Sequence, residues 1–482
     1  MPEHAFLRFG AALIATLLLC AGGASAANLA ALHPDGHWLK DGYGRVVIIH
    51  GLQVAHKTAP YYPPPAGFTS ADGQNLQDWG FNAVRLAWLW AGLEPTRGQF
   101  DSAYVNQFVR DGQILAGHHV YTLLESHQDL YGPALGGDGF PAWATITDGV
   151  PVPPHSALDP EAPDENRAFD NLYANRSGIG DEFARAWRVM ANAFRDNPRM
   201  LGYDLFNEPY PGSHDATCMQ PLGCPAFDRV SLQPLENRLA ADVRASDGRT
   251  IVFYEPHIYF DFGVQSWLGP PPASAGAAGF AFHDYCLAPI FAGQPDAESG
   301  SPGYQSCSYE DEHTMQNAAS ASAAMGVPAL FDEFGDTQDL SNIERMVQLA
   351  DSHQLGWLYW SYKDWIDAPG GVGSGALFDN SDNNATLRRA KLAVLSEPYP
   401  QATAGRPEHY GFDPSTGVFS FAYVPDPSIH APTVVYVPPI HYPAGYSVTV
   451  SGAHVVSAQG ARLLRLATDP GAREVQVAVR PA

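Results

Sequence analysis

Short apolar runs alternate with longer segments along most of the chain. Each run is followed by Gly, Pro, Asn or Asp, and several are apolar at consecutive positions rather than at every second one. Consecutive apolar residues are typical of strands buried on both faces of a parallel sheet. The pattern predicts eight strands, at Val46–Gln53, Ala83–Trp90, Val120–Ser126, Leu201–Phe206, Ile251–Tyr254, Gly279–His283, Ala329–Phe331 and Gly356–Ser361.

Helical periodicity occupies the segments between these runs, and it predicts helices at Ala103–Ala116, Asp181–Phe194, Leu235–Ala245 and Ile343–His353. Eight strand–helix units over roughly 370 residues indicate an α/β fold, a (β/α)8 TIM barrel. A doubly wound open sheet would alternate in the same way, but no Gly-x-Gly-x-x-Gly motif follows any of the strands. Two polar stretches, residues 148–168 and 292–312, are expected to be long loops over the rim of the barrel.

The pattern changes near Tyr399. From there the chain is rich in Val, Tyr, Pro and Thr, and short alternating segments are separated by turn residues, which is typical of a small all-β sandwich. A predicted helix, Ala385–Leu395, and the prolines after it mark the boundary. We therefore expect a barrel over residues 27–404 and a C-terminal β-sandwich over residues 405–482.

The N-terminus has the features of a secretory signal peptide, assigned to residues 1–26. Arg8 precedes an apolar run, Ala11–Ala21, and small residues follow at a suitable cleavage position. The run is too short to span a bilayer. Cys20 leaves a lipoprotein anchor open as an alternative, although Leu19 is large for the position before it. We expect a secreted protein without stable membrane insertion.

Four cysteines follow the signal segment. An even number of cysteines in an exported chain suggests disulfide bonds. Proximity in sequence favours Cys218–Cys224 and Cys286–Cys307, with free thiols as the alternative. No Cys-x-x-Cys or His-Glu-x-x-His motif is present, so neither a metal nor a cofactor is predicted.

Composition and charge exclude several classes of protein. Hydrophobic residues make up 45% of the chain and charged residues 16%, which is enough apolar material for a large core and excludes intrinsic disorder. The net charge of −24 repels phosphate backbones and argues against nucleic acid as a partner. The charge disfavours docking on anionic lipid but does not exclude a neutral lipid substrate.

Two glutamates carry the candidate chemistry. In a TIM barrel the active site lies at the C-terminal ends of the strands. Glu208 follows the fourth strand within Asn-Glu-Pro, and Glu333 follows the seventh within Asp-Glu-Phe-Gly. At roughly 5 Å across the barrel mouth, one would protonate the leaving oxygen while the other attacks, as in a retaining glycosidase. Either glutamate alone would more often be a surface or capping residue.

Other strand ends supply side chains for the same site. Arg85 on the second strand would favour the ionised form of the nucleophile. His127 follows the third strand, and Trp360 on the eighth would form a flat platform under a sugar ring. For each of these residues the alternative is ordinary packing, such as a structural ion pair for Arg85 or a core anchor for Trp360.

Together these residues resemble the active site of glycoside hydrolase family 5. The positions that match are Arg85, His127, Asn207, Glu208, His283, Tyr285, Glu333 and Trp360. The resemblance implies that Glu208 is the acid/base and Glu333 the nucleophile. It also implies that Asn207 holds the sugar 2-hydroxyl and that Tyr285 hydrogen-bonds the nucleophile.

Longer motifs resemble the endoglycoceramidase branch of this family. They are Lys57 after the first strand, His127–Tyr131, Gly137–Trp143, Leu205–Pro209, Tyr254–Pro256, Asp332–Gly335 and Pro398–Pro400. The resemblance implies cleavage between the oligosaccharide and the ceramide of a glycosphingolipid, with Lys57 and Asp129 contacting the sugar next to the scissile bond. Glu125 stands where an aspartate is expected, so branch membership stays open at this point.

Two alternatives remain. One is a family 5 enzyme acting on a simple glycosyl lipid, a steryl glucoside, a glucan or a mannan, and the other is a non-catalytic carbohydrate-binding barrel, against which the glutamate pair argues. A lipid substrate also requires an apolar surface, for which the candidate loops are Tyr61–Pro65, Phe140–Trp143, Ala288–Phe291 and Gly370–Leu377. The sugar series, the oligomeric state and dependence on a detergent or activator are left open.

Overall fold

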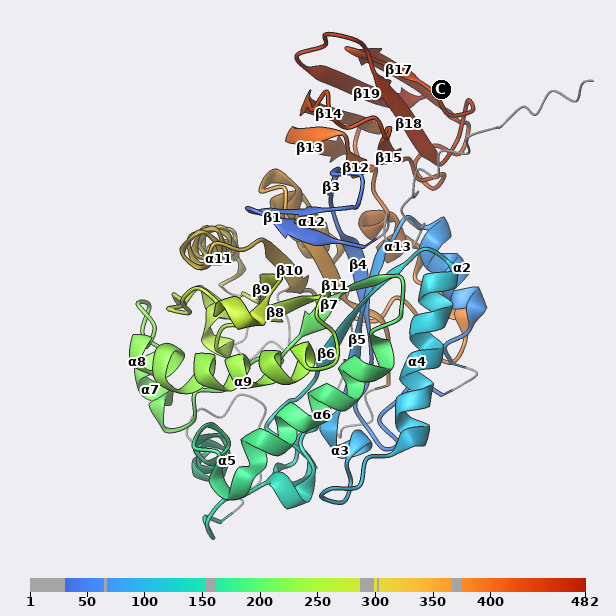
Figure 1. Ribbon diagram of the computed structural model, residues 1–482. Coiled ribbons are helices and arrows are strands. Elements are labelled where there is room, and N and C mark those ends of the chain that lie inside the picture. The colour runs from blue at the N-terminus through green and yellow to red at the C-terminus, as the bar shows by residue number, and fades with distance from the viewer. Residues whose placement is uncertain (1–30, 65–66, 152–161, 287–298, 301–302, 366–374) are drawn as a thin grey trace, which may run out of the picture.

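The computed structural model in Figure 1 describes residues 31–64, 67–151, 162–286, 299–300, 303–365 and 375–482. The predicted signal peptide, with Cys20, lies outside these ranges. A large α/β unit carries a smaller all-β unit at one end (Figure 1).

Eight parallel strands close into a barrel in chain order, which confirms the TIM-barrel prediction. Nearly all of their residues are buried, because one face of each strand fills the barrel and the other contacts the surrounding helices. The strands are β4 (His50–His56), β5 (Ala83–Trp88), β6 (Tyr121–Ser126), β7 (Met200–Asp204), β8 (Ile251–Tyr254), β9 (Ala278–His283), β10 (Ala329–Glu333) and β11 (Gly356–Trp365).

Helices surround the barrel (Figure 1). They are α2 (Ser70–Asp78), α3 (Trp90–Leu93), α4 (Ser102–Gly117), α5 (Pro163–Tyr173), α6 (Ile179–Phe194), α7 (Asp215–Cys218), α8 (Pro225–Phe227), α9 (Gln233–Arg244), α11 (Tyr304–Met325), α12 (Leu340–Ser352) and α13 (Arg389–Leu395). Side-chain caps define two of their starts, since Asp101 accepts backbone hydrogen bonds at the beginning of α4 and Asp339 does so at α12.

The two predicted rim loops are shorter than expected. Helix α5 begins at Pro163, inside the stretch 148–168, and α11 begins at Tyr304, inside 292–312. The sequence does contain a signal for the start of α5, since a proline at the first helical position followed by two acidic residues is typical of a helix start. The polar composition of the stretch conceals this signal. Residues 152–161 and 292–298 lie outside the described ranges.

The smaller unit consists of two antiparallel sheets, as expected for a β-sandwich. One sheet contains β13 (Gly405–Asp413), β14 (Val418–Pro425), β19 (Val475–Pro481) and β16 (Tyr446–Ser451). The other contains β1 (His33–Asp35), β2 (Trp38–Lys40), β3 (Val46–Val47), β12 (Tyr399–Thr403), β15 (Thr433–Tyr436), β18 (Leu463–Thr468) and β17 (Ala453–Val455). Three strands from the N-terminal part of the chain thus complete a sheet of the C-terminal unit.

The predicted first strand, Val46–Gln53, is two strands. Strand β3 pairs with β12 in the sandwich, whereas β4 enters the barrel at His50. Between them, Ile48 packs in the sandwich core and Ile49 in the cluster at the base of the barrel. Residues of one apolar run therefore pack in two different cores. Hydrophobicity alone cannot show where the sandwich strand ends and the barrel strand begins. The expected domain boundary between residues 404 and 405 stays a prediction.

The sandwich is anchored on the turn between α2 and β5. Tyr399 and Gln401 both donate side-chain hydrogen bonds to the carbonyl of Gly80, at 2.7 and 3.0 Å. Tyr436 donates a third bond to the carbonyl of Asp78 at 2.8 Å. This turn precedes β5, so the sandwich covers the N-terminal ends of the barrel strands and leaves the opposite, C-terminal end for the chemistry.

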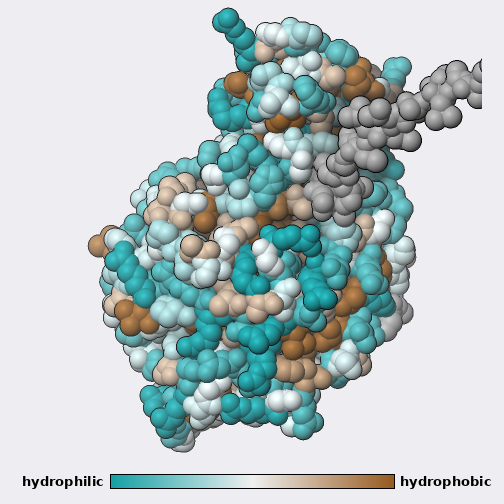
Figure 2. Space-filling model, in the orientation of Figure 1, coloured by the Kyte–Doolittle hydropathy of each residue, from teal (hydrophilic) through white to brown (hydrophobic). Residues whose placement is uncertain are grey.

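Both predicted disulfide pairings are confirmed. The Cα atoms of Cys218 and Cys224 are 4.7 Å apart, and those of Cys286 and Cys307 are 5.2 Å apart. Among helices in the described part of the chain, none is both long and apolar enough to span a bilayer. On the face shown in Figure 2, hydrophobic residues form separate groups between hydrophilic ones.

The anchoring turn gives a stability prediction. Gly80 has a φ of +86°, and a Cβ at this position would lie 2.2 Å from the Tyr436 ring. Gly80→Ala should therefore lose roughly 1–2 kcal/mol of unfolding free energy through backbone strain, and a further 1–3 kcal/mol or so through overpacking. Denaturant unfolding measures both effects.

Gly98 supplies the matched control, because its φ is +78° and a Cβ added there would meet nothing within 4 Å. Gly98→Ala should show the backbone effect alone. Equal losses in the two variants would show that close packing on Tyr436 does not hold the sandwich in place.

Candidate active site

The predicted site residues share one location, the C-terminal ends of the barrel strands. Lys57 follows β4, Arg85 lies on β5, His127 and Asp129 follow β6, Asn207 and Glu208 follow β7, His283 ends β9, Tyr285 follows it, Glu333 ends β10, and Trp360 lies on β11. They form two groups, one around Arg85 and one around Lys57. Glu125 on β6 touches both, lying 3.8 Å from Arg85 and 2.9 Å from His127.

Arg85 is the centre of the first group. Its Nη1 donates to Glu333 Oε2 at 2.7 Å and to Gln53 Oε1 at 3.0 Å. Its Nη2 donates to Asn207 Oδ1 at 2.9 Å, and its Nε and Nη2 both donate to Asp204 Oδ2, at 2.9 and 2.6 Å. The planar guanidinium thus fixes side chains from several different barrel strands or strand ends.

The charge around Arg85 is strongly unbalanced. This fully buried cation lies between 2.6 and 3.8 Å from five carboxyl groups, those of Glu125, Asp204, Glu255, Asp332 and Glu333. One guanidinium cannot neutralise five carboxylates in a buried site. Burial, together with the charge of Asp204, raises the pKa values of Glu255 and Asp332 well above normal, which favours their neutral forms.

Glu333 has a donor on each carboxyl oxygen. Arg85 binds Oε2, and the Tyr285 hydroxyl donates to Oε1 at 2.9 Å. The Tyr285 backbone N–H donates to the carbonyl of Asp261 at 2.9 Å, which holds the loop after β9. Two fixed donors on opposite oxygens determine the plane of the Glu333 carboxylate.

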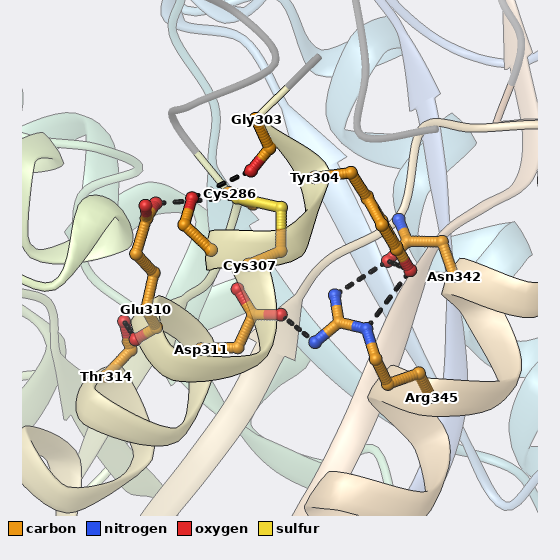
Figure 3. Close-up of a disulfide and its surroundings, with 10 residues drawn as sticks. Cys286, Gly303, Tyr304, Cys307, Glu310, Asp311, Thr314, Asn342 and Arg345 are labelled. Carbon is orange, nitrogen blue, oxygen red and sulfur yellow. Dashed lines mark hydrogen bonds and ion pairs between the residues drawn. A yellow bond between two sulfur atoms is a disulfide. The ribbon is translucent and has the colours of Figure 1, made fainter. Parts of the chain in front are cut away.

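The loop after β9 is linked to the outer helices through Cys286 (Figure 3). Cys286, the residue after Tyr285, is disulfide-bonded to Cys307 on α11. On the next turn of α11, Asp311 forms an ion pair with Arg345 of α12, which also donates to the Tyr304 hydroxyl at 3.1 Å. The disulfide therefore connects the loop of Tyr285, which hydrogen-bonds Glu333, to helices α11 and α12.

Glu208 lies on an irregular turn. Its φ is +43°, a left-handed conformation that is uncommon for glutamate. The Glu208 backbone N–H donates to Glu255 Oε1 at 2.6 Å, and Gln128 donates to the Glu208 carbonyl at 2.9 Å and to the Asn207 carbonyl at 3.0 Å. Side-chain hydrogen bonds thus satisfy backbone N–H and C=O groups that have no partner in a neighbouring strand.

His283 lies between the two glutamates. Its Nδ1 is 2.9 Å from Glu208 Oε1, and its Nε2 is 4.0 Å from Glu333 Oε2. Burial lowers the pKa of His283 to about 4, so the ring is neutral at neutral pH. Burial, with the charge of Asp129, raises the pKa of Glu208 to about 7. Glu208 is therefore a group that can give up or accept a proton near neutrality.

The second group is built on Lys57 and Asp129. Lys57 Nζ forms an ion pair with Asp129 Oδ2 and lies 4.5 Å from the centre of the Trp360 ring. Burial opposes ionisation of Asp129, but the charges of Lys57 and His127 outweigh it and hold the pKa of Asp129 well below its usual value. For His127, burial is outweighed by the charge of Glu125, and the pKa rises to about 10. The glutamate at position 125 thus makes a direct contact with His127.

Trp360 is less accessible than a free sugar platform. Its ring stacks against His127, with centroids 5.5 Å apart and planes inclined by 16°, and only 3% of the residue is exposed. Lys57 lies over the same ring. The platform role stays a prediction, while the burial fits the alternative of a packed anchor.

The apolar loop candidates have different positions. Phe140 is buried in the main core, so this part of the Phe140–Trp143 loop is not a lipid surface. Tyr61 and Tyr62 are partly exposed and pack against the same core. Ala288–Phe291 and most of Gly370–Leu377 lie outside the described ranges.

Sequence reasoning missed the acidic and amide residues that surround Arg85. They are Gln53, Asp204, Glu255 and Asp332. The sequence does point to them, because each is a polar residue within or directly after an apolar strand. A polar side chain buried at such a position needs a hydrogen-bonding or charged partner. Their common partner could not be identified, since they come from different strands.

Three groups of possible metal ligands lie within the described residues. In one, His127, Asp129 and Asp138, the Lys57 ammonium is already bound to Asp129. In the second, Glu208, Asp261 and His283, the imidazole already contacts Glu208. The third, Cys224, Asp228 and His257, includes a disulfide-bonded cysteine. The expectation of no metal and no cofactor stays a prediction.

Two family models match the chain. "Cellulase (glycosyl hydrolase family 5)" matches residues 43–365, and "Glycoside hydrolase family 5 C-terminal domain" matches residues 398–480. Endoglycoceramidase I of Rhodococcus hoagii is 33% identical over 453 residues, covering 92% of this chain and 87% of the relative.

Solved structures of endo-glycoceramidase II from Rhodococcus sp. are similar over nearly the whole chain. The complex with ganglioside GM3 has a TM-score of 0.77 at 28% identity, covering 93% of this chain and 100% of that one. The lactosyl-enzyme intermediate has a TM-score of 0.76 at 29% identity, covering 92% of this chain and 99% of that one.

The charges around Glu208 give a prediction for its titration. Asp129 raises the pKa of Glu208, whereas Lys57 and His127 lower it. Asp129→Asn removes the negative charge, leaves Lys57 without its ion-pair partner and leaves His127 paired with Glu125 alone, so the pKa of Glu208 should fall below 7. Carbon NMR of labelled glutamate side chains measures this pKa, and the signal is assigned by its loss in Glu208→Gln.

Asp413→Asn is the control, because Asp413 is an exposed carboxylate of the sandwich. It should leave the titration of Glu208 unchanged. An unchanged or higher pKa in Asp129→Asn would show that the Asp129 group does not act electrostatically on Glu208.

Proposed function

The chain belongs to glycoside hydrolase family 5, and from this premise we propose that it is a retaining endo-glycosidase that hydrolyses the bond between the oligosaccharide and the ceramide of glycosphingolipids. The observation that carries the proposal is the pair of glutamates on either side of His283. The similarity to endoglycoceramidases over nine-tenths of the chain supports the substrate class.

In the proposed first step, Glu333 attacks the anomeric carbon while Glu208 gives its proton to the glycosidic oxygen of the leaving ceramide. A covalent glycosyl–enzyme ester forms and the carbon–oxygen bond to ceramide breaks. In the second step, Glu208 takes a proton from water, which attacks the same carbon and releases Glu333 as a carboxylate. The pKa of Glu208 near 7 supports both roles, because a group that must donate and then accept a proton works best near its own pKa.

Arg85 and Tyr285 serve Glu333 in this mechanism. Their hydrogen bonds orient the attacking oxygen and stabilise the carboxylate when the ester breaks in the second step. Both donors already contact Glu333, so little reorganisation is needed when charge develops.

Asn207, Lys57 and Asp129 are proposed to contact the sugar. Asn207 accepts from Arg85 through Oδ1 and donates to the Gln128 carbonyl at 3.1 Å through Nδ2. These bonds fix the orientation of its amide, and the second N–H of Nδ2 can donate to the 2-hydroxyl. The partly exposed Lys57–Asp129 pair offers a charged donor and an acceptor to hydroxyl groups of the adjoining ring.

We propose that the protein is secreted through residues 1–26. Two disulfides support an oxidising destination. Dependence on a detergent or an accessory activator is an open expectation, because the proposed substrate is itself a membrane or micelle component.

Mass analysis of the products tests the substrate class. A ganglioside, a neutral glycosphingolipid and a soluble glucan are incubated with the protein. The proposal expects intact oligosaccharide and intact ceramide from at least one glycosphingolipid and no cleavage of the glucan. Release of single terminal sugars only, or faster cleavage of the glucan, would favour another glycosidase of the family.

Two glutamine variants test the roles of the glutamates. Glu208→Gln should slow cleavage of the natural lipid by about 10²–10⁴-fold. It should affect formation of the glycosyl–enzyme from a glycosyl fluoride, measured as kcat/KM, far less, because fluoride needs no proton to leave. Glu333→Gln should abolish turnover of both substrates. Proton NMR of the first product should show the anomeric configuration of the substrate.

Folding of both variants is checked by circular dichroism and thermal unfolding. Hydrolysis of the fluoride by Glu333→Gln at the wild-type rate would exclude Glu333 as the nucleophile. An inverted first product would exclude the two-step mechanism while leaving the substrate class untouched.

A further inference from the structure

A second cavity lies at the opposite end of the barrel from the glutamates, between the barrel and the sandwich. It has a volume of about 490 Å³. The barrel contributes α2 and the segments before β5, β6 and β7, and the sandwich contributes β12, β15 and the region of β18. None of the proposed catalytic residues lines it.

The lining is basic although the protein is strongly acidic. Over the whole chain, 51 acidic residues oppose 27 Lys and Arg. In this cavity the proportion is reversed, with only Asp41 and Asp78 as acidic residues. The basic residues of the lining are Arg45, Arg199, Arg462, Arg465, His118 and His119.

Both acidic residues are already paired. Arg45 binds Asp41 Oδ2 through Nε at 2.9 Å and Nη2 at 2.7 Å. Arg462 Nη1 lies 2.5 Å from Asp78 Oδ1. Each acidic residue therefore neutralises one arginine, and the charges of the other two arginines of the lining, Arg199 and Arg465, are not balanced by either of them.

Arg199 and Arg465 have no carboxylate partner within the residues that the structure describes. The Arg199 guanidinium lies 5.1 Å from the centre of the Tyr121 ring and interacts with the side chain of Tyr121. A guanidinium carries five N–H donors, so one tyrosine cannot use them all. The pKa of His119 is lowered by burial and by the positive charges of Arg199 and His118, which agrees with an excess of positive charge here.

We propose that this cavity binds an oxyanion, a carboxylate or phosphate group carried by a small polar molecule. A planar guanidinium matches two oxygens of such a group, and charge-assisted hydrogen bonds are the strongest polar contacts available to a ligand. The volume falls in the range of small-molecule sites and exceeds what a bare phosphate fills. This site is independent of the function proposed for the glutamates.

The charge of the remaining surface makes the proposal specific. A protein with a net charge of −24 repels anions over most of its surface. Measurable anion binding therefore requires a local excess of positive charge. Among the described residues, this cavity has such an excess, and both the barrel and the sandwich contribute to it.

Isothermal titration calorimetry at low ionic strength tests the proposal with four probes that are not products of the proposed glycosidase reaction. They are glycerol 3-phosphate, glycerate, inorganic phosphate and, as the neutral counterpart, glycerol. We expect binding of glycerol 3-phosphate, of glycerate or of both, and none of glycerol. Tighter binding of glycerol 3-phosphate assigns the site to a phosphate group, and tighter binding of glycerate assigns it to a carboxylate.

Arg199→Gln and Arg465→Gln should each weaken anion binding about tenfold or more, because each removes a charged donor. Arg199→Lys keeps the charge and should weaken it less. Arg473→Gln is the matched control, since Arg473 is an exposed arginine of the same sandwich that does not line the cavity. It should bind like the wild type.

Circular dichroism and the hydrolysis rate of a soluble glycoside show that the variants are folded, and both should remain as in the wild type. The proposal is overturned if neither glycerol 3-phosphate nor glycerate binds, if inorganic phosphate alone binds, if glycerol binds as tightly as they do, or if the Arg199→Gln/Arg465→Gln double variant binds as the wild type does.

Discussion

The site depends on one buried cation. Arg85 contacts Glu333, Asn207 and Asp204 at the same time, and its own burial is tolerable only because acidic groups surround it. Removal of one member of such a buried network leaves an uncompensated charge, which is strongly destabilising. The requirement is mutual, since the acidic residues need Arg85 as much as Arg85 needs them. The positions of Glu333 and Asn207 at the mouth of the barrel therefore depend on the ion pairs and hydrogen bonds of Arg85.

The same balance separates the two glutamates chemically. Glu333 receives two donors, one of them a permanent cation, while the Glu208 carboxyl contacts a neutral imidazole and lies within 4.8 Å of the Asp261 carboxyl. Different environments around two like groups are how one site obtains an acid and a nucleophile at the same pH. The left-handed backbone at Glu208 belongs to this arrangement, because Gln128 and Glu255 hold the turn that presents its side chain.

The sequence allowed the barrel, the sandwich and the glutamate pair to be predicted, because strand-end positions follow directly from the order of apolar runs. It could not reveal the acidic shell of Arg85, which only closure of the barrel brings together. It also hid the break after Val47, since Ile48 and Ile49 look alike in sequence but belong to different cores. The basic cavity is invisible for the same reason, as its arginines are scattered along the chain.

The pairing of β3 with β12 has a consequence for how the chain acquires its shape. Val47 of β3 pairs with Ala402 of β12, so β3 cannot pair until the ribosome has made the C-terminal part of the chain. Contacts between such distant residues form slowly and leave an unpaired strand edge exposed in the meantime. Strand β4 begins three residues later, which places the first barrel strand beside that open edge. Completion of the barrel base and closure of the sandwich sheet are thus expected as one late, concerted event.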